Sequence, residues 1–375
     1  MQLMLTGSLS RERIKLIRRQ NVPVLLDEFK TVHSIFSDDA RNMQAIHASS
    51  VDLVVTSPPY PMIGMWDELF TQLNPQIGRY IMDNSPDLAY DLMHQELGMV
   101  WNEVYRVLKP GGIACINIGD ATRTVGGEYR LYPSHSTVSA SMRDIGFYES
   151  PSIIWRKQSN SPNKFLGSGT MPPGAYVTLE HEYILLFRKP PRRQFSGTGE
   201  KKIRSESSYF WEERNQWFSD LWENVKGVRQ GLSDAETRKR SAAFPFEVPY
   251  RLINMFSVAG DTVLDPFLGT GTTTLAAIAS MRNSIGYEKE PELCNRVIEN
   301  ALKGTESLNE YLEKRIQRHL DYVKNTEIKG SAFSYFNEHH GFPVKTRNER
   351  DLCIRKVKSI HPGNSGNAIT AFHSL

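Results

Sequence analysis

The sequence is poor in cysteine and has no long apolar run. Its three cysteines, Cys115, Cys294 and Cys353, lie far apart among 375 residues. An odd, scattered set of this kind excludes a disulfide framework or a zinc knuckle. The apolar stretches are well short of the roughly 18 residues that a membrane helix needs, and the start of the chain has no secretion signal with a small-residue cleavage site. These absences predict a soluble, cytoplasmic protein without a metal site or a membrane partner.

An excess of charge of one sign is also missing. The chain has 45 basic and 42 acidic residues, a net charge of +3, which excludes a histone-like polycation or an acidic solvating tail. Nucleic acid stays open as a partner, because binding depends on where the positive charge lies. The length is sufficient for one large core, or for a main core with a smaller satellite.

Strand and helix signals alternate along most of the chain. Short apolar or β-branched runs predict strands at 51–55, 113–119, 152–157, 181–188, 262–265 and 283–288. Helices are predicted at 93–108, 134–145, 247–257, 272–280, 291–302 and 306–324. This alternation is typical of an α/β fold with parallel strand pairs.

A loop rich in glycine and threonine, DPFLGTGTTT (265–274), joins a predicted strand to a helix. Asp265 ends the strand at the edge where open α/β sheets bind ligands, and Gly269 and Gly271 permit a tight turn. The spacing is neither G-x-G-x-x-G nor a triphosphate loop. Taken alone, such a turn is often only a tight connection. Because Glu288 ends the next strand, the two acids favour an adenosyl ligand that carries a cationic group.

The pentapeptide TSPPY (56–60) follows another predicted buried strand. Pro58 and Pro59 fix φ and supply no N–H, so the loop is stiff. Ser57 Oγ and the Pro58 carbonyl can accept two N–H bonds from an exocyclic amino group, while Tyr60 stacks on the ring that carries it. The pentapeptide alone is equally compatible with a rigid turn in which Tyr60 covers the core.

The two loops together resemble the motif pair of S-adenosylmethionine-dependent amino-methyltransferases of DNA. The catalytic motif precedes the cofactor motif by roughly two hundred residues, an order that resembles the β group of bacterial and archaeal modification methyltransferases. The likeness spans residues 33–303 and includes SDDARNM, RVLKPGG, WRK…HEYILLF and FPFEVPYRLI. It implies an α/β fold with a seven-stranded, mostly parallel sheet and a smaller inserted DNA-recognition region.

The resemblance also implies a role for each matched position. The catalytic set would be Ser57, Pro58, Pro59 and Tyr60. The S-adenosyl-L-methionine site would contain Asp39 at the adenine edge, Glu288 at the ribose, Phe244 and Pro245 beside the methionine moiety, and Asp265, Phe267, Gly269, Thr270, Gly271 and Thr272 in the glycine-rich loop. Spacing does not separate Asp39 from Asp38, and either acid is equally compatible with a solvated helix cap.

The serine before the two prolines bears on the target base. In the family it usually marks N4-cytosine enzymes, whereas adenine-N6 enzymes more often carry aspartate or asparagine there. The resemblance therefore implies direct methyl transfer to cytosine N4 in duplex DNA after base flipping, in partnership with a restriction endonuclease. Adenine N6 is the alternative, and an RNA or protein methyltransferase or an inactive DNA-binding module is more distant. No cysteine follows a proline, which excludes the thiolate mechanism of C5-cytosine methylation.

A basic run, RKPPRRQFSGTGEKKIR (188–204), lies between the two motifs. It has seven basic residues and one acidic residue, and because Pro, Gly and Ser interrupt it, it is predicted to be a loop. A charge run is usually a solvated surface, but this location favours contact with DNA phosphates. The predicted DNA-binding residues are Arg192, Arg193, Lys201, Lys202, Arg204, Arg238, Lys239 and Arg240.

Five segments are expected along the chain. A leader at 1–33 precedes the catalytic half of the methyltransferase domain at 34–188. A DNA-recognition insert at 189–243 follows, with its tryptophans predicted to form the core of a small domain. The cofactor-binding half is expected at 244–303, and an extension at 304–375 holds one helix and a polar tail. Duplex DNA is the expected partner, and a monomer or homodimer is expected.

Overall fold

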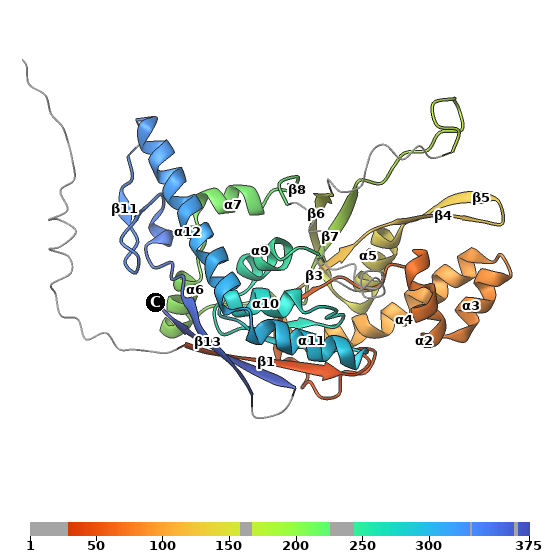
Figure 1. Ribbon diagram of the computed structural model, residues 1–375, viewed down its shortest axis with the longest axis horizontal. Coiled ribbons are helices and arrows are strands. Elements are labelled where there is room, and N and C mark those ends of the chain that lie inside the picture. The colour runs from red at the N-terminus through yellow and green to blue at the C-terminus, as the bar shows by residue number, and fades with distance from the viewer. Residues whose placement is uncertain (1–28, 158–166, 226–243, 331, 364–366) are drawn as a thin grey trace, which may run out of the picture.

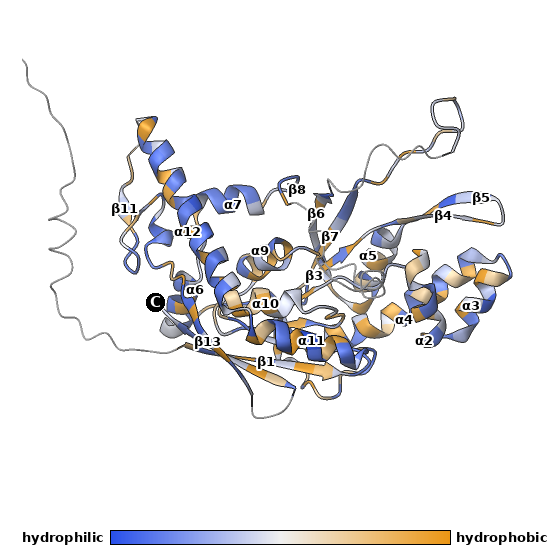
Figure 2. Cartoon of the chain, viewed as in Figure 1, coloured by the Kyte–Doolittle hydropathy of each residue, from blue (hydrophilic) through white to orange (hydrophobic). Residues whose placement is uncertain are grey.

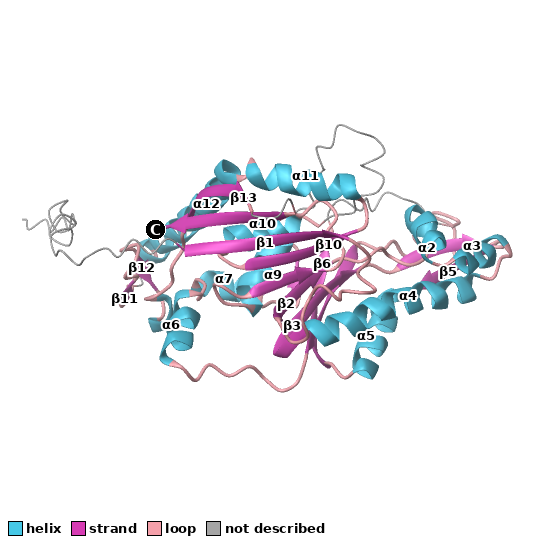
Figure 3. Cartoon of the chain, turned by 90° about the horizontal axis from the view of Figure 1, so that it is seen from below, coloured by secondary structure: helices cyan, strands magenta, loops and turns pink. Residues whose placement is uncertain are grey.

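The centre of the protein is a mixed ten-stranded sheet (Figures 1 and 3). The computed structural model describes residues 29–157, 167–225, 244–330, 332–363 and 367–375. The strand order is β13-β14-β1-β10-β9-β2-β3-β7-β6-β8. These strands span β1 Phe29–Ser37, β2 Val51–Thr56, β3 Leu108–Ile118, β6 Tyr148–Arg156, β7 His181–Arg188, β8 Leu221–Trp222, β9 Thr262–Asp265, β10 Asn283–Glu288, β13 Lys356–Pro362 and β14 Ala368–Ser374.

Two short hairpins and a set of helices complete the described fold. The hairpins pair β4 Ala121–Val125 with β5 Glu128–Tyr132, and β11 Tyr335–Phe336 with β12 Pro343–Val344. The helices are η1 Gly64–Trp66, α2 Asp67–Leu73, α3 Pro75–Met82, α4 Pro86–Val107, α5 Ser134–Ile145, α6 Thr198–Glu206, α7 Trp211–Trp217, α9 Glu247–Phe256, α10 Thr272–Ala279, α11 Pro291–Leu302, α12 Thr305–Ile328 and η2 Arg347–Glu349. None of them, within the described ranges, is long and apolar enough to cross a membrane.

The inner seven strands form the sheet that the sequence predicts. β1, β10, β9, β2 and β3 are parallel neighbours, and β7 runs antiparallel between β3 and β6. β2 is buried along its whole length, as expected for a central parallel strand with both faces covered. The α/β class is confirmed, although the sheet has ten strands rather than seven.

Helices cover both faces of the sheet. The side chains of β2 alternate between two apolar clusters: Leu53 and Val55 pack with residues of α9 to α12, whereas Val54 packs with residues of α4 and α5. Figure 2 shows hydrophobic residues along α10 and hydrophilic bands along α12. α12 buries one face through residues spaced three or four apart, as expected for an amphipathic helix against a core.

The three additional strands come from segments that were not predicted as strands. The polar tail contains the hairpin β13–β14, and β14 pairs antiparallel with β1. Buried and less buried residues alternate along β14, the period that a half-buried strand shows. At the opposite edge β8 pairs with β6. β1 begins at Phe29, inside the segment expected to be a leader, and residues 1–28 lie outside the described part of the chain.

Two predictions for the insert are wrong. The basic run is not entirely a loop, because residues 198–206 form α6, where the Glu200 side chain accepts hydrogen bonds from the Ser196 and Gly197 N–H groups. The buried tryptophans do not form a separate small core either. Trp217 and Trp222 pack in the main apolar cluster.

Candidate functional site

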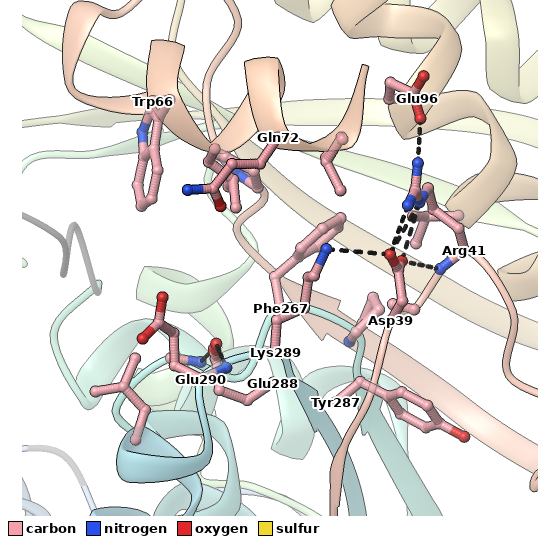
Figure 4. Close-up of a pocket in the computed structure, with 18 of the residues that line it drawn as sticks. Asp39, Arg41, Trp66, Gln72, Glu96, Phe267, Tyr287, Glu288, Lys289 and Glu290 are labelled. Carbon is pink, nitrogen blue, oxygen red and sulfur yellow. Dashed lines mark hydrogen bonds and ion pairs between the residues drawn. The ribbon is translucent and has the colours of Figure 1, made fainter. Parts of the chain in front are cut away.

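A pocket of about 440 Å³ opens at the carboxyl ends of four neighbouring strands. The pocket is lined by residues 38–41, which follow β1, and by 287–290, the last two residues of β10 and the two after it. The loops after β9 and β2 contribute residues within 266–269 and 57–59. Trp66, which ends η1, and Gln72 of α2 lie across the pocket from Glu288 and Glu290 (Figure 4). The volume is in the range of small-molecule sites, about 300–1,000 Å³.

Six of the predicted site residues line this pocket. They are Asp39, Ser57, Pro59, Phe267, Gly269 and Glu288, with Asp38 beside Asp39. The remaining predicted residues are absent from the lining: Pro58, Tyr60, Phe244, Pro245, Asp265, Thr270, Gly271 and Thr272. The structure therefore brings part of each motif loop together at one cavity. The other residues of both motifs do not line it.

Asp39 is held by two cations at the pocket rim. Arg41 Nη2 lies 2.7 Å from Asp39 Oδ2, and Lys289 Nζ lies 3.2 Å from the same oxygen. Burial alone would raise the pKa of Asp39, but the hydrogen bonds and charge of Arg41 lower it to about 2. Arg41 also pairs with Glu96 of α4 at 2.6 Å. Asp39 is thus a fixed carboxylate, and each of its oxygens already accepts at least two hydrogen bonds from Arg41 and Lys289.

Glu288 links the end of β10 to the glycine-rich loop. Its Oε2 accepts the Gly269 N–H at 2.9 Å, and its Oε1 accepts the Glu290 N–H at 3.0 Å. Burial raises the pKa of this carboxyl. A carboxylate has about four acceptor sites, and three backbone N–H groups, of Gly269, Lys289 and Glu290, approach this one, so it remains able to accept one hydroxyl from a ligand.

Asp265 joins the two motif loops instead of lining the pocket. Its Oδ1 accepts bonds from Thr56 Oγ1 at 2.6 Å and from the Phe267 N–H at 3.1 Å. Its Oδ2 accepts a bond from Thr273 Oγ1 at 2.6 Å. The carboxylate is 2% exposed, and burial raises its pKa from 3.8 to about 6. The sequence predicts that Asp265 contacts a cationic ligand. In the structure its carboxylate instead holds the two motif loops together through hydrogen bonds.

The glycine-rich loop turns sharply before α10. Gly271 has a φ of 81° and precedes the helix, and a Cβ there would lie 2.5 Å from Val297 Cγ1. Only glycine fits a left-handed position so close to another side chain. Phe244 and Pro245 are buried, and Phe244 packs in the apolar core. The expected place of this pair beside a ligand stays a prediction.

The catalytic motif presents Ser57 and Pro59 to the pocket and buries Tyr60, which is 6% exposed. Ser57 Oγ and Tyr60 Oη are 3.1 Å apart, and Tyr60 Oη donates to Glu182 Oε2 at 2.9 Å. Asn117 Nδ2 donates to Tyr60 Oη at 2.8 Å and to Glu182 Oε2 at 2.7 Å. Lys157 pairs with the other oxygen of Glu182.

Sequence reasoning missed this polar cluster, and it missed Trp66, Arg41 and Glu96 in the pocket wall. Glu182 lies within HEYILLF, one of the segments that carry the family resemblance, but no spacing connects it with Tyr60, which is 122 positions away. Such partners follow from strand order, because β3, β7 and β6 are neighbours in the sheet. Among the described residues no group of His, Cys, Asp and Glu could hold a metal ion.

The basic run, residues 188–204, lies near the amino ends of the parallel strands, opposite the end that carries the pocket. Arg193 pairs with Asp261, which precedes β9, at 2.7 Å and lies 3.7 Å from Asp52 at the start of β2. Lys189 exchanges backbone hydrogen bonds with residues 111 and 112, near the start of β3. Figures 1 and 3 show α6 far from the pocket edge. Arg192, Lys201, Lys202 and Arg204 are exposed, while Arg238, Lys239 and Arg240 lie outside the described residues.

This placement argues against the expected role of Arg193, whose guanidinium is already paired. The run and the pocket lie at opposite ends of the parallel strands, and the DNA contacts expected of its other basic residues stay a prediction.

Comparison with known proteins identifies the family. The sequence model of the DNA methylase family, which covers N6 and N4 enzymes, matches residues 51–300. This range contains both motif loops and the strands that carry them. The chain belongs to the DNA methylase family. The membership predicted from the motif pair is thereby confirmed.

This DNA methylase has relatives of high identity along most of its length. It is 51% identical over 327 residues to the Type II methyltransferase M.MthZI of Methanothermobacter thermautotrophicus, covering 87% of this chain and 90% of the relative. It is 54% identical over 277 residues to the Type II methyltransferase M.MjaI of Methanocaldococcus jannaschii, covering 71% and 90%.

A solved structure shares the fold of the DNA methylase. TTHA0409 of Thermus thermophilus, provisionally described as a DNA modification methylase and solved with S-adenosyl-L-methionine, matches with a TM-score of 0.56 and 31% identity. The match covers 72% of this chain and 95% of that one.

Proposed function

We propose that this DNA methylase transfers a methyl group from S-adenosyl-L-methionine to the N4 amino group of cytosine in duplex DNA. The observation that carries the proposal is the position of Ser57, the serine of TSPPY, on the rim of the pocket that Asp39, Phe267 and Glu288 line. The relatives that are named Type II methyltransferases support a role in modifying DNA at a specific site, which protects it from a matching restriction endonuclease.

The pocket residues fit an adenosyl ligand. The buried Glu288 carboxylate, which holds backbone N–H groups on both oxygens, would accept a ribose hydroxyl, and Asp39 with its partners Arg41 and Lys289 would form the adenine edge of the site. Phe267 and Trp66 supply aromatic faces in the same cavity. S-adenosyl-L-methionine supplies a methyl group activated by a positively charged sulfur.

The chain's task in this reaction is to position the acceptor amine. The lone pair of an aryl amine is delocalised into the ring, so the nitrogen is a weak nucleophile in its planar form. Ser57 Oγ and the Pro58 carbonyl would each accept one N–H, which favours a pyramidal nitrogen whose lone pair faces the methyl group. Orientation of this kind can contribute about 7–11 kcal/mol. No strong base is required, because the amine becomes acidic once it is methylated.

We infer that DNA approaches the carboxyl edge of the sheet. A base inside a duplex cannot reach the Ser57 loop, so it must be flipped out at a cost of a few kcal/mol. The hairpin β4–β5 and residues 167–180, which precede β7, project from this side of the molecule (Figure 1). The hairpin carries Arg130, whose side chain is 47% exposed and pairs with the exposed Asp87 at 2.8 Å; an exposed pair of this kind contributes little, so DNA phosphates can compete for the guanidinium.

The test is incubation of the purified protein with labelled S-adenosyl-L-methionine and unmethylated plasmid DNA, followed by nucleoside analysis. We expect labelled N4-methylcytosine. Labelled N6-methyladenine would overturn the choice of base and leave amino-methyl transfer standing. Absence of label in DNA, with an active cofactor preparation, would contradict the proposal.

A further inference from the structure

A buried polar cluster lies directly behind the catalytic loop. It contains Asn117 from β3, Glu182 from β7 and Lys157, which follows β6. Asn117 is 2% exposed and Glu182 is 7% exposed. Burying an ionisable side chain is costly unless its partners compensate, and each of these groups is aimed at the Tyr60 hydroxyl or at a group that contacts it.

The direction of the hydrogen bonds follows from counting protons. Tyr60 has one hydroxyl proton, and a carboxylate only accepts, so Tyr60 Oη donates to Glu182 Oε2. The contact of 3.1 Å between Ser57 Oγ and Tyr60 Oη must then be donated by Ser57. With its proton turned toward Tyr60 and one lone pair facing Asn117 Nδ2 at 3.3 Å, Ser57 Oγ keeps a second lone pair for an amine N–H that arrives from the pocket.

Two further features keep this arrangement in place. Lys157 pairs with the second oxygen of Glu182, and burial and the charge of Glu182 raise the pKa of Tyr60 well above its usual value, so Tyr60 keeps its proton. Gly119 provides the space: a Cβ there would lie 2.9 Å from Tyr60 Cε2 and 3.3 Å from Glu182 Cγ. Tyr60 and Glu182 therefore occupy the space that a side chain at position 119 would take.

We propose that Glu182, paired with Lys157, is a positioning residue for methyl transfer, which acts through Tyr60 to turn the Ser57 hydroxyl into an acceptor for the target amine. The inference rests on the proposed amino-methyl transfer and assigns a role to residues outside both motif loops. Without the carboxylate, Tyr60 is free to donate its proton to Ser57. The Ser57 hydroxyl would then point its own proton toward the target amine, where the reaction needs a hydrogen-bond acceptor.

The test is a double-mutant cycle of Glu182→Gln and Tyr60→Phe, measured by single-turnover methyl transfer with saturating cofactor and DNA. A neutral amide accepts a weaker hydrogen bond than a carboxylate, so Glu182→Gln should slow transfer about 10- to 100-fold, as small misplacements at reacting centres do. Dissociation constants for cofactor and DNA should change less than threefold, on the order of ordinary mutational scatter. In the Tyr60→Phe background, Glu182→Gln should have almost no further effect.

The matched control is Glu180→Gln, which removes the same charge two positions away. Glu180 pairs with Arg156 at 3.2 Å, is 30% exposed and has no contact with Tyr60, so transfer should proceed at the wild-type rate. If Glu182→Gln does not fold, Lys157→Met replaces it in the cycle, with Lys157→Arg expected to restore the rate.

Two results would overturn the inference: wild-type transfer by Glu182→Gln, or rate losses for Glu182→Gln and Tyr60→Phe that multiply in the double variant. Either would leave methylation by the wild-type protein intact. Failure of the proposed function is distinguishable, because the wild-type protein itself would then transfer no methyl group to DNA.

Discussion

At the residue scale, Asp265 connects the catalytic and the cofactor-side loops through three hydrogen bonds, to Thr56, the Phe267 N–H and Thr273. Thr56 immediately precedes Ser57, and Phe267 lines the pocket. One buried carboxylate therefore sets the distance between the two loops. This explains how an acid that is absent from the pocket lining can affect both ligand binding and the reaction.

Asp265→Asn should alter how stability depends on pH. The folded pKa of about 6 exceeds the usual 3.8, so the protonated carboxyl contributes stability that is complete below about pH 4 and is lost as the pH rises through about 6. The free energy of unfolding of the wild type, relative to Asp265→Asn, should therefore fall between about pH 4 and pH 6. Urea denaturation at several pH values measures the difference, and a flat difference would contradict a raised pKa.

Ser57→Ala tests the proposed acceptor. It removes one hydrogen bond to the target amine, so single-turnover methyl transfer should slow about tenfold, the equivalent of about 1.4 kcal/mol. DNA binding should change less. Ser50→Ala is the control, because Ser50 donates to the His47 carbonyl just before β2 begins. Transfer by Ser57→Ala at the wild-type rate would make Ser57 structural and remove the main support for cytosine N4.

The sequence indicates the loop residues that line the pocket, but not the residues that hold those loops in place. Ser57, Phe267 and Glu288 stand at fixed positions in recognisable loops, and all three line the cavity. Arg41 and Glu182 act through partners 55 and 122 positions away, and such pairs follow only once strand order is known. The same reasoning explains Asp265, whose position was predicted but whose contacts point to Thr56 and Thr273.

At the element scale, each motif begins where a parallel strand ends and the chain turns into a loop. The strands and helices predicted for the α/β fold are present, and α5 begins and ends at the residues that the sequence indicates. The hairpin β13–β14 was missed, because it lies in a polar tail and β13, KVKSIHP, is too polar to be recognised as a strand. The hairpin joins the sheet through β14, which pairs with β1 on one side and with β13 on the other.

Gly271→Ala tests the turn that begins α10. A side chain at a φ of 81° and 2.5 Å from Val297 should cost about 1–3 kcal/mol of unfolding free energy, and cofactor affinity should fall because the turn also sets Gly269. Gly199→Ala in α6 is the matched control, since a Cβ there meets nothing within 4 Å, and it should not destabilise. Equal stability of the two variants, measured by denaturation, would refute the steric argument.

At the scale of the whole molecule, the sheet separates the pocket edge from the basic run. Charge counting along the sequence cannot show this, because it does not say at which end of the strands an insert returns. The ion pair of Arg193 with Asp261 indicates that part of the run serves the fold, and the DNA surface is expected around the strand ends that carry Ser57.

Neutralising Arg192, Lys201 and Lys202 together should therefore leave the salt dependence of DNA binding unchanged. Each lost phosphate contact would lower the slope of log affinity against log salt by about 0.9. Binding isotherms between low and moderate salt measure this slope. A decrease of two or more, by that same relation, would restore the run as a DNA-binding surface.

Sequencing of the modified base in product DNA tests the central claim most directly. After reaction of the wild-type protein with S-adenosyl-L-methionine and unmethylated duplex DNA, the position and chemical identity of every methylated base are determined. We predict N4-methylcytosine at one recurring sequence. Methyl groups on adenine N6 would contradict the assignment of the base, and DNA without methylated amino groups would contradict the assignment of the function.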